Sequence, residues 1–308
     1  MTKLLKPEAL AAGDRVAVLS PASPCDRGLT LQGIDELRSL GFIPVFDEGI
    51  FLSEGYLAGS AVYRAEAFRR AWIDPDIKGI FSTRGGYGSS EILPLLEKSE
   101  IRAGRKVFVG FSDLTMLLVY LTNYCGLTCF HGPMMVDFAN GSSGYDRDSL
   151  IKVMTIKEPE GQICPSGIET LKTGEQKGLL LGGTLTQLLA SLGTPYAFNP
   201  PDGHVLFLDD IGERPYRIDR MLTQLKHAGL LKRASAVVFG EFPECQGVDG
   251  NDVRAVILRV LDEFSGPILY GFPSGHTTGP IITLPFGVVV TVKTGSHPGI
   301  VVEEAAVK

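Results

Sequence analysis

The first half of the chain alternates short hydrophobic runs, rich in β-branched residues, with longer segments in which hydrophobic residues recur every three or four positions. A strand that is buried on both faces is hydrophobic along its whole length, whereas a surface helix is hydrophobic along one stripe. These patterns predict strands over 15–21, 42–47 and 106–110 and at the start of 77–88, and helices over 29–41, 63–74 and 114–126. Strands and helices in alternation predict a parallel sheet with helices on both faces, the arrangement of flavodoxin-like domains.

Residues 140–175 interrupt this alternation with glycine, proline and charged residues. Such a composition is typical of a segment that connects two domains. We therefore expect an N-terminal α/β domain over residues 1–160 and a C-terminal domain over residues 161–308.

The second half mixes strand and helix patterns less regularly. It contains a strand, a double glycine and a helix in 178–193, further strands at 204–212 and 234–242, helices at 217–231 and 253–266, and strand-like runs at 268–273, 282–295 and 300–305. These segments predict a mixed α/β domain. The fold class expected for the chain is therefore α/β, with a parallel-sheet domain followed by a mixed one.

The charge and the cysteines limit the classes of partner and compartment. Nucleic-acid-binding proteins usually present a basic face, so a formal net charge of −6 argues against a nucleic-acid partner. No hydrophobic run has transmembrane length and the N-terminus lacks the pattern of a signal peptide, so we expect a cytoplasmic protein without a membrane partner. Five scattered cysteines, without a CxxC pair or metal-ligand spacing, predict mostly buried thiols in a reducing compartment and no metal site: Cys25, Cys125, Cys129, Cys164 and Cys245.

The residue types needed for serine hydrolysis occur at the ends of predicted strands. The reaction uses a hydroxyl nucleophile, an imidazole that takes and returns its proton, and usually a carboxylate that fixes the imidazole tautomer. Ser112 follows KVFVGF and His276 follows ILYGFPSG, while Asp209 and Asp210 follow HVLFL. Open α/β sheets place their sites at strand ends, so these residues form a candidate active site.

Each of these residues has a competing interpretation. A serine before a helix, such as Ser112, is more often an N-cap than a nucleophile. His131, in CFHGPMM, lies at another apparent strand end and stays a second candidate for the base. His227 is expected on a helix near its C-terminal turn, and His204 and His297 lie beside turn residues and are expected in solvent.

The glycine-rich loop TRGGYGSSE at 83–91 suggests an anion site, since such turns before helices present backbone N–H groups. It matches neither the dinucleotide fingerprint nor the Walker pattern. The same loop can offer N–H groups to a developing oxyanion, with Arg84 or Tyr87 organising the site. Composition alone leaves these alternatives open.

Seven stretches in order resemble the L,D-carboxypeptidase family of serine peptidases, which includes murein tetrapeptide carboxypeptidases and their microcin-immunity relatives. The stretches cover nearly the whole chain and read YLAGSAVYR (56–64), STRGGYGSSEILPLL (82–96), VGFSDLT (109–115), HGPMM (131–135), LGGTLTQL (181–188), LFLDDIGERPYRIDRML (206–222) and PSGH (273–276).

The resemblance implies a Ser-Glu-His triad assembled between the two domains. The serine falls on Ser112, the histidine on His276 and the acid on Asp209, where the family usually has glutamate. The shorter carboxylate puts the geometry of the acid in question, and Asp210 and Glu213 are nearby alternatives.

The resemblance also assigns an oxyanion role to the backbone N–H groups near Gly86 and of Asp113, and it implies a homodimer. The free carboxylate of a peptide substrate needs a cationic or N–H partner, for which we select Arg84. The chemistry requires no metal or organic cofactor.

The expected activity is hydrolysis of the bond to a C-terminal D-alanine in muropeptide tetrapeptides during cell-wall recycling. A first alternative is cleavage of a peptide-nucleotide antibiotic, as in the microcin-immunity relatives. Those relatives tend to carry an aromatic residue that stacks on the nucleobase, whereas Trp72, the only tryptophan, lies in an early predicted helix. A second alternative is a catalytically silent protein that binds wall peptides, which the aspartate at 209 would mark.

Overall fold

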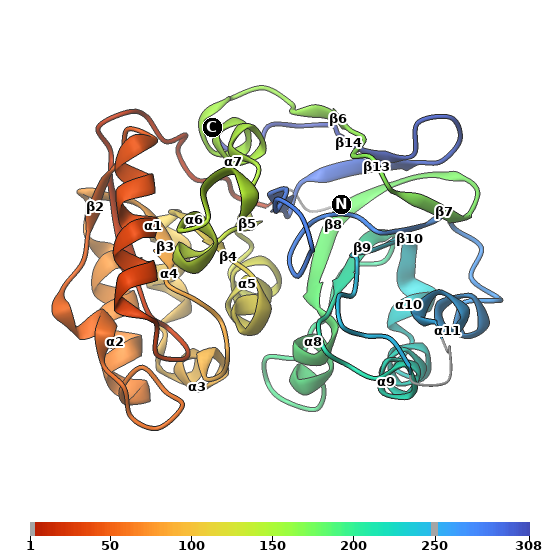
Figure 1. The fold of residues 1–308 in the computed structure, drawn as a ribbon, viewed down its shortest axis with the longest axis horizontal. Coiled ribbons are helices and arrows are strands. Elements are labelled where there is room, and N and C mark those ends of the chain that lie inside the picture. Colours follow the sequence, from red (N-terminus) through yellow and green to blue (C-terminus); the bar gives the residue numbers. More distant parts are fainter. Residues whose placement is uncertain (1–3, 248–251) are drawn as a thin grey trace.

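The structure is a computed structural model that describes residues 4–247 and 252–308, and its two sheets lie side by side (Figure 1). The first sheet has the strand order β12-β5-β4-β3-β1-β2, in which every pair is parallel except β12 with β5. Its strands are β1 (Arg15–Leu19), β2 (Ile43–Val45), β3 (Ile77–Ser82), β4 (Val107–Gly110), β5 (Cys129–His131) and β12 (Leu284–Phe286). The order 2-1-3-4-5 is that of flavodoxin-like domains, so the prediction for this half is confirmed.

Helices cover both faces of the first sheet, since α1 packs against α6 whereas α2 packs against α3 and α4. The helices of this half are α1 (Arg27–Ser39), α2 (Ala61–Ile73), α3 (Ser89–Ile92), α4 (Lys98–Gly104), α5 (Thr115–Val119), α6 (Met135–Phe138) and α7 (Arg147–Thr155). The first two begin earlier than the hydrophobic pattern suggests, because the side chains of Asp26 and Ser60 accept hydrogen bonds from backbone N–H groups of the first turn.

The segment expected as a uniform helix over 114–126 changes its winding along its length. A 3₁₀ turn (Ser112–Leu114) precedes α5, and a wider π-helical turn (Tyr120–Tyr124) follows it. The Thr122 hydroxyl donates to the Leu118 carbonyl within this region, a bond that competes with the regular helical ladder.

The second sheet mixes parallel and antiparallel strands, as predicted for this half. Its order is β6-β14-β13-β8-β9-β10-β11-β7, with β8 to β11 parallel. The strands are β6 (Gly161–Ile163), β7 (Glu169–Lys172), β8 (Glu175–Thr184), β9 (His204–Asp209), β10 (Ala234–Phe239), β11 (Ile268–Tyr270), β13 (Val289–Lys293) and β14 (Gly299–Val302). Its helices are α8 (Leu185–Ser191), α9 (Pro215–His227), α10 (Leu230–Arg233) and α11 (Val253–Val260).

The second sheet separates two hydrophobic cores. On β9, Val205 and Phe207 belong to the core shared with the first sheet, whereas Leu206 and Leu208 pack against α8, α9 and α11. Successive side chains of a strand point to opposite faces. The side chain of Asp209, at the end of β9, therefore lies on the same face of the strand as Val205 and Phe207, which is the face toward the first sheet.

The run at 282–295 does not form one strand. It divides at Gly287, whose φ is +90°, a conformation that favours glycine. Before this residue β12 pairs with β5 in the first sheet, and after it β13 pairs with β8 in the second. The C-terminal half of the chain thus completes the sheet of the N-terminal half.

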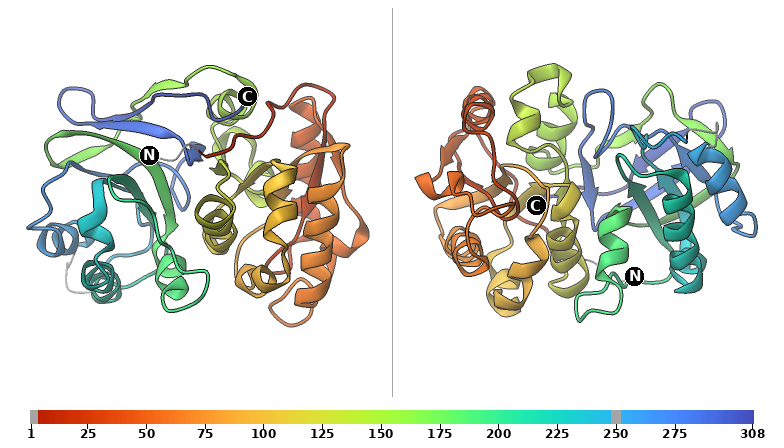
Figure 2. Two further views of the ribbon diagram at one scale, coloured as in Figure 1. Left: turned by 180° about the vertical axis from the view of Figure 1, so that it is seen from behind. Right: turned by 60° about the horizontal axis from the view of Figure 1, so that its bottom comes forward.

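The connecting segment at 140–175 and the chain ends also tie the halves together. The segment contains α7 and the two strands at the edges of the second sheet, β6 and β7, so it is more ordered than its composition suggests. The C-terminus returns to the N-terminal segment (Figure 2), where the N–H of Lys308 donates to the Pro7 carbonyl and the N–H of Ala9 donates to the Lys308 carbonyl.

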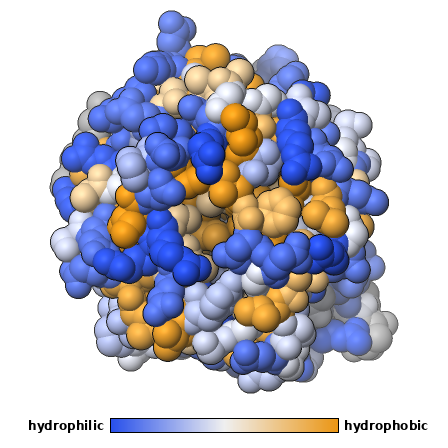
Figure 3. Space-filling view, turned by 90° about the vertical axis from the view of Figure 1, so that its left-hand side faces the viewer, coloured by the Kyte–Doolittle hydropathy of each residue, from blue (hydrophilic) through white to orange (hydrophobic). Residues whose placement is uncertain are grey.

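Strand β2 is a free edge of the first sheet, and Ile43 on it is 49% exposed. Figure 3 views the side of the molecule formed by α1, α2 and β2, where hydrophobic residues lie among hydrophilic ones. A groove of about 220 Å³ beside β2 is lined by Val45, Phe46, Arg70 and Asp74, among others.

Candidate active site

Ser112 stands at the corner between β4 and the helix that follows it. Its φ is +63°, which is unusual for a residue other than glycine. Backbone strain of this kind costs about 1–3 kcal/mol and clusters at functional sites. The turn starts a helix immediately, so the first N–H groups, including that of Asp113, have no acceptor within the helix.

His276 lies in the loop after β11 and reaches Ser112 across the two halves of the chain. Its Nε2 is 3.2 Å from Ser112 Oγ, and its Nδ1 is 2.7 Å from Asp209 Oδ2. Phe111 packs edge-on against the imidazole, with ring centroids 5.1 Å apart. Gly275 precedes it with φ +72°, and a Cβ there would come within 2.4 Å of Asp209 Oδ2, so this position requires glycine.

The structure brings Asp209, and neither of the other two carboxylates considered, to His276. Asp209 Oδ2 also accepts the backbone N–H of His276 at 2.8 Å, and Oδ1 accepts the Thr184 hydroxyl at 3.1 Å. Asp210 has the opposite parity and accepts the N–H and hydroxyl of Thr186. Glu213 pairs instead with Arg217, at 3.5 Å.

The charges of this group support one another. Burial raises the pKa of the Asp209 carboxyl, but the rings of His131 and His276 outweigh that effect and hold the pKa well below its usual range. Burial lowers the pKa of His276, but the bond to Asp209 and its charge outweigh it, so the pKa is raised. The pair therefore favours a cationic imidazole next to an anionic carboxylate.

His131 lies next to the Asp209 carboxylate. Among the hydrogen bonds of the described residues, none joins His131 to Ser112. It is fully buried, with Nδ1 3.2 Å from Ser274 Oγ and Nε2 3.7 Å from Asp209 Oδ1. The second candidate for the base is thus a neighbour of Asp209, the candidate acid.

The expectation that His204 lies in solvent is wrong. It begins β9, is fully buried and places Nδ1 2.9 Å from the Pro201 carbonyl, and its burial lowers its pKa to about 4. The preceding turn ends at Gly203, so His204 is already the first residue of the strand. His227 ends α9, as predicted.

The glycine-rich loop after β3 passes beside Ser112. A Cβ on Gly85 would lie 2.8 Å from Ser112 Cβ and 3.2 Å from the Asp113 nitrogen, so the loop backbone packs directly on the corner. Arg84 and Tyr87 are exposed, and Tyr87 packs edge-on against Tyr56 with ring centroids 5.6 Å apart. Asp113 is buried, and burial raises the pKa of its carboxyl.

Sequence reasoning missed Thr184, Ser274 and Gly275, which support Asp209 and the histidines. Thr184 ends β8 next to Asp209 in the parallel register, and Gly275 belongs to the PSGH stretch. The sequence does show that Thr184 is a polar residue at the end of a predicted strand. Its closeness to Asp209 could be inferred only once β8 was known to lie next to β9.

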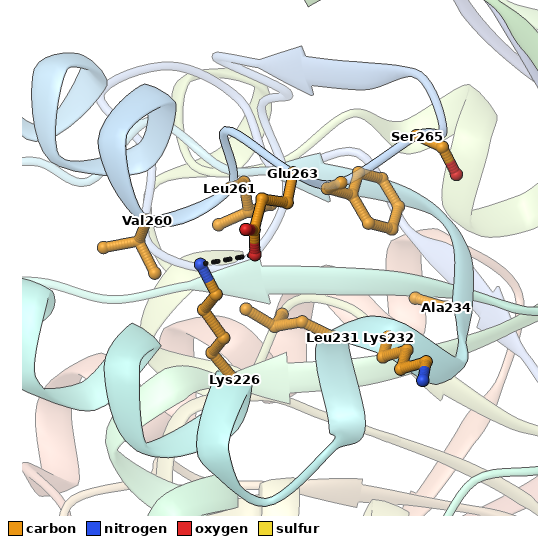
Figure 4. A pocket seen from close by; sticks show the side chains of 9 residues that line it. Lys226, Leu231, Lys232, Ala234, Val260, Leu261, Glu263 and Ser265 are labelled. Carbon is orange, nitrogen blue, oxygen red and sulfur yellow. Dashed lines mark ion pairs between the residues drawn. The ribbon is translucent and has the colours of Figure 1, made fainter.

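A pocket of about 460 Å³ lies elsewhere, on the outer side of the second sheet between α9, α10 and α11 (Figure 4). Lys226 and Glu263 form an ion pair at its mouth, with Nζ and Oε2 3.4 Å apart. Its lining contains no histidine that could activate a nucleophile. This pocket is separate from the candidate active site.

Residues 4–247 and 252–308 contain no group of three or more His, Cys, Asp or Glu side chains arranged to hold a metal ion. No helix within the same ranges is long and apolar enough to cross a membrane.

Comparison with known proteins identifies relatives along the full chain. Residues 16–132 match the LD-carboxypeptidase N-terminal domain and residues 177–292 match the LD-carboxypeptidase C-terminal domain. A Bacillus subtilis protein named "Probable murein peptide carboxypeptidase" is 32% identical over 312 residues, which cover 98% of this chain and 97% of the relative.

Two solved structures share the fold. A muramoyltetrapeptide carboxypeptidase from Oxalobacter formigenes is 28% identical with a TM-score of 0.83, covering 94% of this chain and 99% of that one. The microcin C7 self-immunity protein MccF of Escherichia coli, with aspartyl sulfamoyl adenosine, is 26% identical with a TM-score of 0.87, covering 99% of this chain and 100% of that one. The chain therefore belongs to the LD-carboxypeptidase family of peptidases.

Proposed function

We propose that this protein is a serine L,D-carboxypeptidase that removes the C-terminal D-alanine from muropeptide tetrapeptides in cell-wall recycling. The observation that carries the proposal is the continuous chain of contacts from Ser112 Oγ through His276 to Asp209, at 3.2 and 2.7 Å. The family and the names of its relatives supply the substrate class.

In the first step Ser112 Oγ attacks the carbonyl carbon of the bond to the terminal residue. His276 Nε2 takes the hydroxyl proton, because the bond from Nδ1–H to Asp209 leaves Nε2 as the acceptor. The buried carboxylate stabilises the imidazolium that forms. His276 then returns the proton to the leaving amine, and D-alanine departs from an acyl-enzyme.

In the second step a water molecule attacks the acyl carbon and His276 again takes the proton. Release of the Ser112 oxygen restores the enzyme and frees the shortened peptide. In both steps negative charge develops on the carbonyl oxygen. The backbone N–H groups of Asp113 and Gly86 are the proposed donors to it, which the packing of Gly85 against Ser112 supports.

The carboxylate of the D-residue distinguishes this substrate from the middle of a peptide. Arg84 is exposed in the same loop and makes no ion pair with another described residue, so its guanidinium is available for that carboxylate. Tyr87, beside it, is 48% exposed and is the proposed contact for the body of the substrate.

The test is release of D-alanine from L-Ala-D-Glu-meso-diaminopimelate-D-Ala. We expect release by the parent protein, none above background by Ser112→Ala and a steep decrease for Asp209→Ala. Ser53→Ala, at an exposed serine, is the matched control and should equal the parent. A folded parent that releases no D-alanine would show that the proposal is wrong for this substrate.

The likeness to MccF favours a second candidate, cleavage of an aminoacyl-sulfamoyl nucleoside. Trp72 argues against it, because the only tryptophan is 1% exposed and its Nε1 donates to the Ile101 carbonyl, so it is not available to stack on a base. Hydrolysis of aspartyl sulfamoyl adenosine by a protein that leaves the tetrapeptide intact would favour this candidate. Peptide binding without turnover of either compound, unaffected by Ser112→Ala, would favour the silent binder.

The proposal includes a cytoplasmic location and a homodimer, both expected from the sequence. Light scattering of the purified protein measures the second of these directly, and a monomer at assay concentration would contradict it.

A further inference from the structure

Arg64 on α2 is an arginine with almost no contact with solvent. The residue is 1% exposed, and arginine is rarely buried to this extent unless it is fully paired. It lies outside the chain of contacts formed by Ser112, His276 and Asp209. Its partners show what its burial achieves.

The guanidinium joins three separate loops at the carboxyl end of the first sheet. Its Nε donates to the Gly59 carbonyl at 3.1 Å, and its Nη1 donates to the carbonyls of Pro21 at 2.8 Å and Gly88 at 2.7 Å. Its Nη2 pairs with Glu91 at 2.6 Å. The three loops follow β1, precede α2 and follow β3, and only the planar fork of an arginine can serve all of them at once.

One of these contacts continues to the nucleophile. Gly88 leads into Ser89, whose N–H donates to Asp113 Oδ2 at 2.8 Å and whose hydroxyl donates to the Asp113 carbonyl at 2.6 Å. Asp113 follows Ser112 and carries one of the two proposed oxyanion donors. A Cβ on Gly88 would come within 2.9 Å of Arg64 Nη1, so the close approach depends on glycine.

The other two contacts fix the opposite side of the same loop. Pro21 and Gly59 lie near Ser23 and Tyr56 in the chain, and the Ser23 hydroxyl donates to the Tyr56 carbonyl at 2.8 Å and accepts the N–H of Tyr87 at 3.0 Å. A Cβ on Gly86 would lie 2.4 Å from Ser23 Oγ. The loop that carries Gly86 is therefore held from both sides.

We infer that Arg64 is a positioning residue for catalysis, which holds the loop of Gly86 and the N–H of Asp113 at the spacing that an oxyanion requires. The inference rests on the proposed function for the nucleophile alone and not on the identity of the peptide. Arg64 touches neither substrate nor reacting atoms, and it acts through Gly88, Ser89 and Asp113.

The test measures the nucleophile with and without a peptide. A fluorophosphonate reacts when Ser112 Oγ forms a bond to phosphorus, the P–F bond breaks, fluoride leaves and the proton passes to His276. The phosphoryl oxygen needs the same donors as a peptide oxyanion. The rate of labelling is measured for the parent, Arg64→Met, Arg64→Lys and Ser89→Ala, together with kcat and KM for the tetrapeptide.

We expect Arg64→Met to lower the labelling rate and kcat about 10²-fold, as misplacement by about 1 Å does, while KM changes little. Arg64→Lys should recover only part of this loss, and Ser89→Ala, which removes one hydrogen bond, should lower both rates by up to about tenfold. The acid limb of the pH profile should stay in place, because His276 and Asp209 are untouched. Arg69→Met, on the same helix at an exposed pair with Glu100, is the matched control and should label like the parent.

Labelling of folded Arg64→Met at the parental rate would overturn the inference. If Arg64→Met does not fold, the partial variants decide, and parental rates for both Arg64→Lys and Ser89→Ala would overturn it. A parent that is labelled but inactive on the tetrapeptide would refute the proposed substrate and leave this inference supported by the labelling rates. A parent that is not labelled at Ser112 would refute both.

Discussion

Replacing Asp209 with asparagine separates the charge of the acid from its geometry. The carboxylate accepts two N–H groups of His276 on Oδ2 and the Thr184 hydroxyl on Oδ1, and His131 Nε2 lies 3.7 Å from Oδ1 without a hydrogen-bond partner. An asparagine can keep its oxygen toward His276 and turn its NH₂ toward Thr184 Oγ1 and His131 Nε2, both of which can accept. The histidine tautomer should therefore survive the substitution.

The expected loss in Asp209→Asn is that of the charge alone. A hydrogen bond to a charged group is worth about 1.5–3 kcal/mol and one between neutral groups about 0.5–1.5 kcal/mol. The difference of about 1–2 kcal/mol acts when the imidazolium forms and corresponds to a fall in kcat of roughly 5- to 30-fold. Where an asparagine forces the wrong tautomer in a serine protease triad, the fall is about 10⁴-fold.

The pH profile provides the second measurement. His276 serves as a base only when neutral, and Asp209 raises its pKa. Loss of the carboxylate lowers that pKa, so the acid limb of kcat/KM should move to lower pH in Asp209→Asn. Asp202→Asn, at an exposed aspartate, is the control and should leave the limb in place. A fall near 10⁴-fold, or a limb that stays or moves to higher pH, would refute the reasoning.

The remaining predictions concern the surroundings of the acid and the carboxylate of the substrate. Gly275→Ala should lower the hydrolysis rate at least about 10²-fold, because the new Cβ displaces Asp209 Oδ2 by contact at 2.4 Å; parental activity would contradict this. Asp209→Glu adds a methylene to a side chain that is 0% exposed, and should lower the free energy of unfolding in urea by about 1–3 kcal/mol and reduce activity; an equally stable, more active variant would show that the site has room. Burial raises the pKa of Asp137 from 3.8 to about 6, so the folded state loses stability as pH rises through that range. In Asp137→Asn the decline of the thermal midpoint between pH 4 and 6 should therefore be less steep than in the parent protein. An unchanged slope would refute the raised pKa of Asp137. Arg84→Ala should raise KM for the tetrapeptide about tenfold or more with a smaller change in kcat, and an unchanged KM would remove Arg84 from substrate binding.

Local sequence patterns were sufficient to predict most of the helices and strands and the turn at Ser112. Hydrophobic periodicity located four of the five parallel strands of the first sheet, β1 to β4, and the caps at Asp26 and Ser60 account for the small differences at helix starts. The run KVFVG followed by FSD predicted a turn into a helix at Ser112, and the structure has that turn with φ +63°. These features depend on contacts between residues close in the chain.

The choice among the three carboxylates was partly available from the sequence. Alternation along HVLFLDD places Asp209 on the face of Val205 and Phe207 and Asp210 on the other. Which of the two faces meets Ser112 depends on how the sheets pack, and no local pattern carries that information. The shorter side chain reaches His276 because the register of β8, β9 and the loop at Gly275 brings the backbone close.

The sequence by itself determined two things about this chain. Periodic burial gives its two α/β halves, and the motifs read in order give its resemblance to the LD-carboxypeptidase family. The resemblance assigned the histidine to His276, but only the tertiary structure showed that His276 Nε2 lies 3.2 Å from Ser112 Oγ whereas His131 lies beside Asp209. These distances depend on how the two sheets pack against each other. The same holds for β12, which crosses to the first sheet, and for Arg64, whose three loops are distant in sequence. Pairings between segments that are distant in sequence are set by the packing of the whole chain, and local sequence patterns do not encode them.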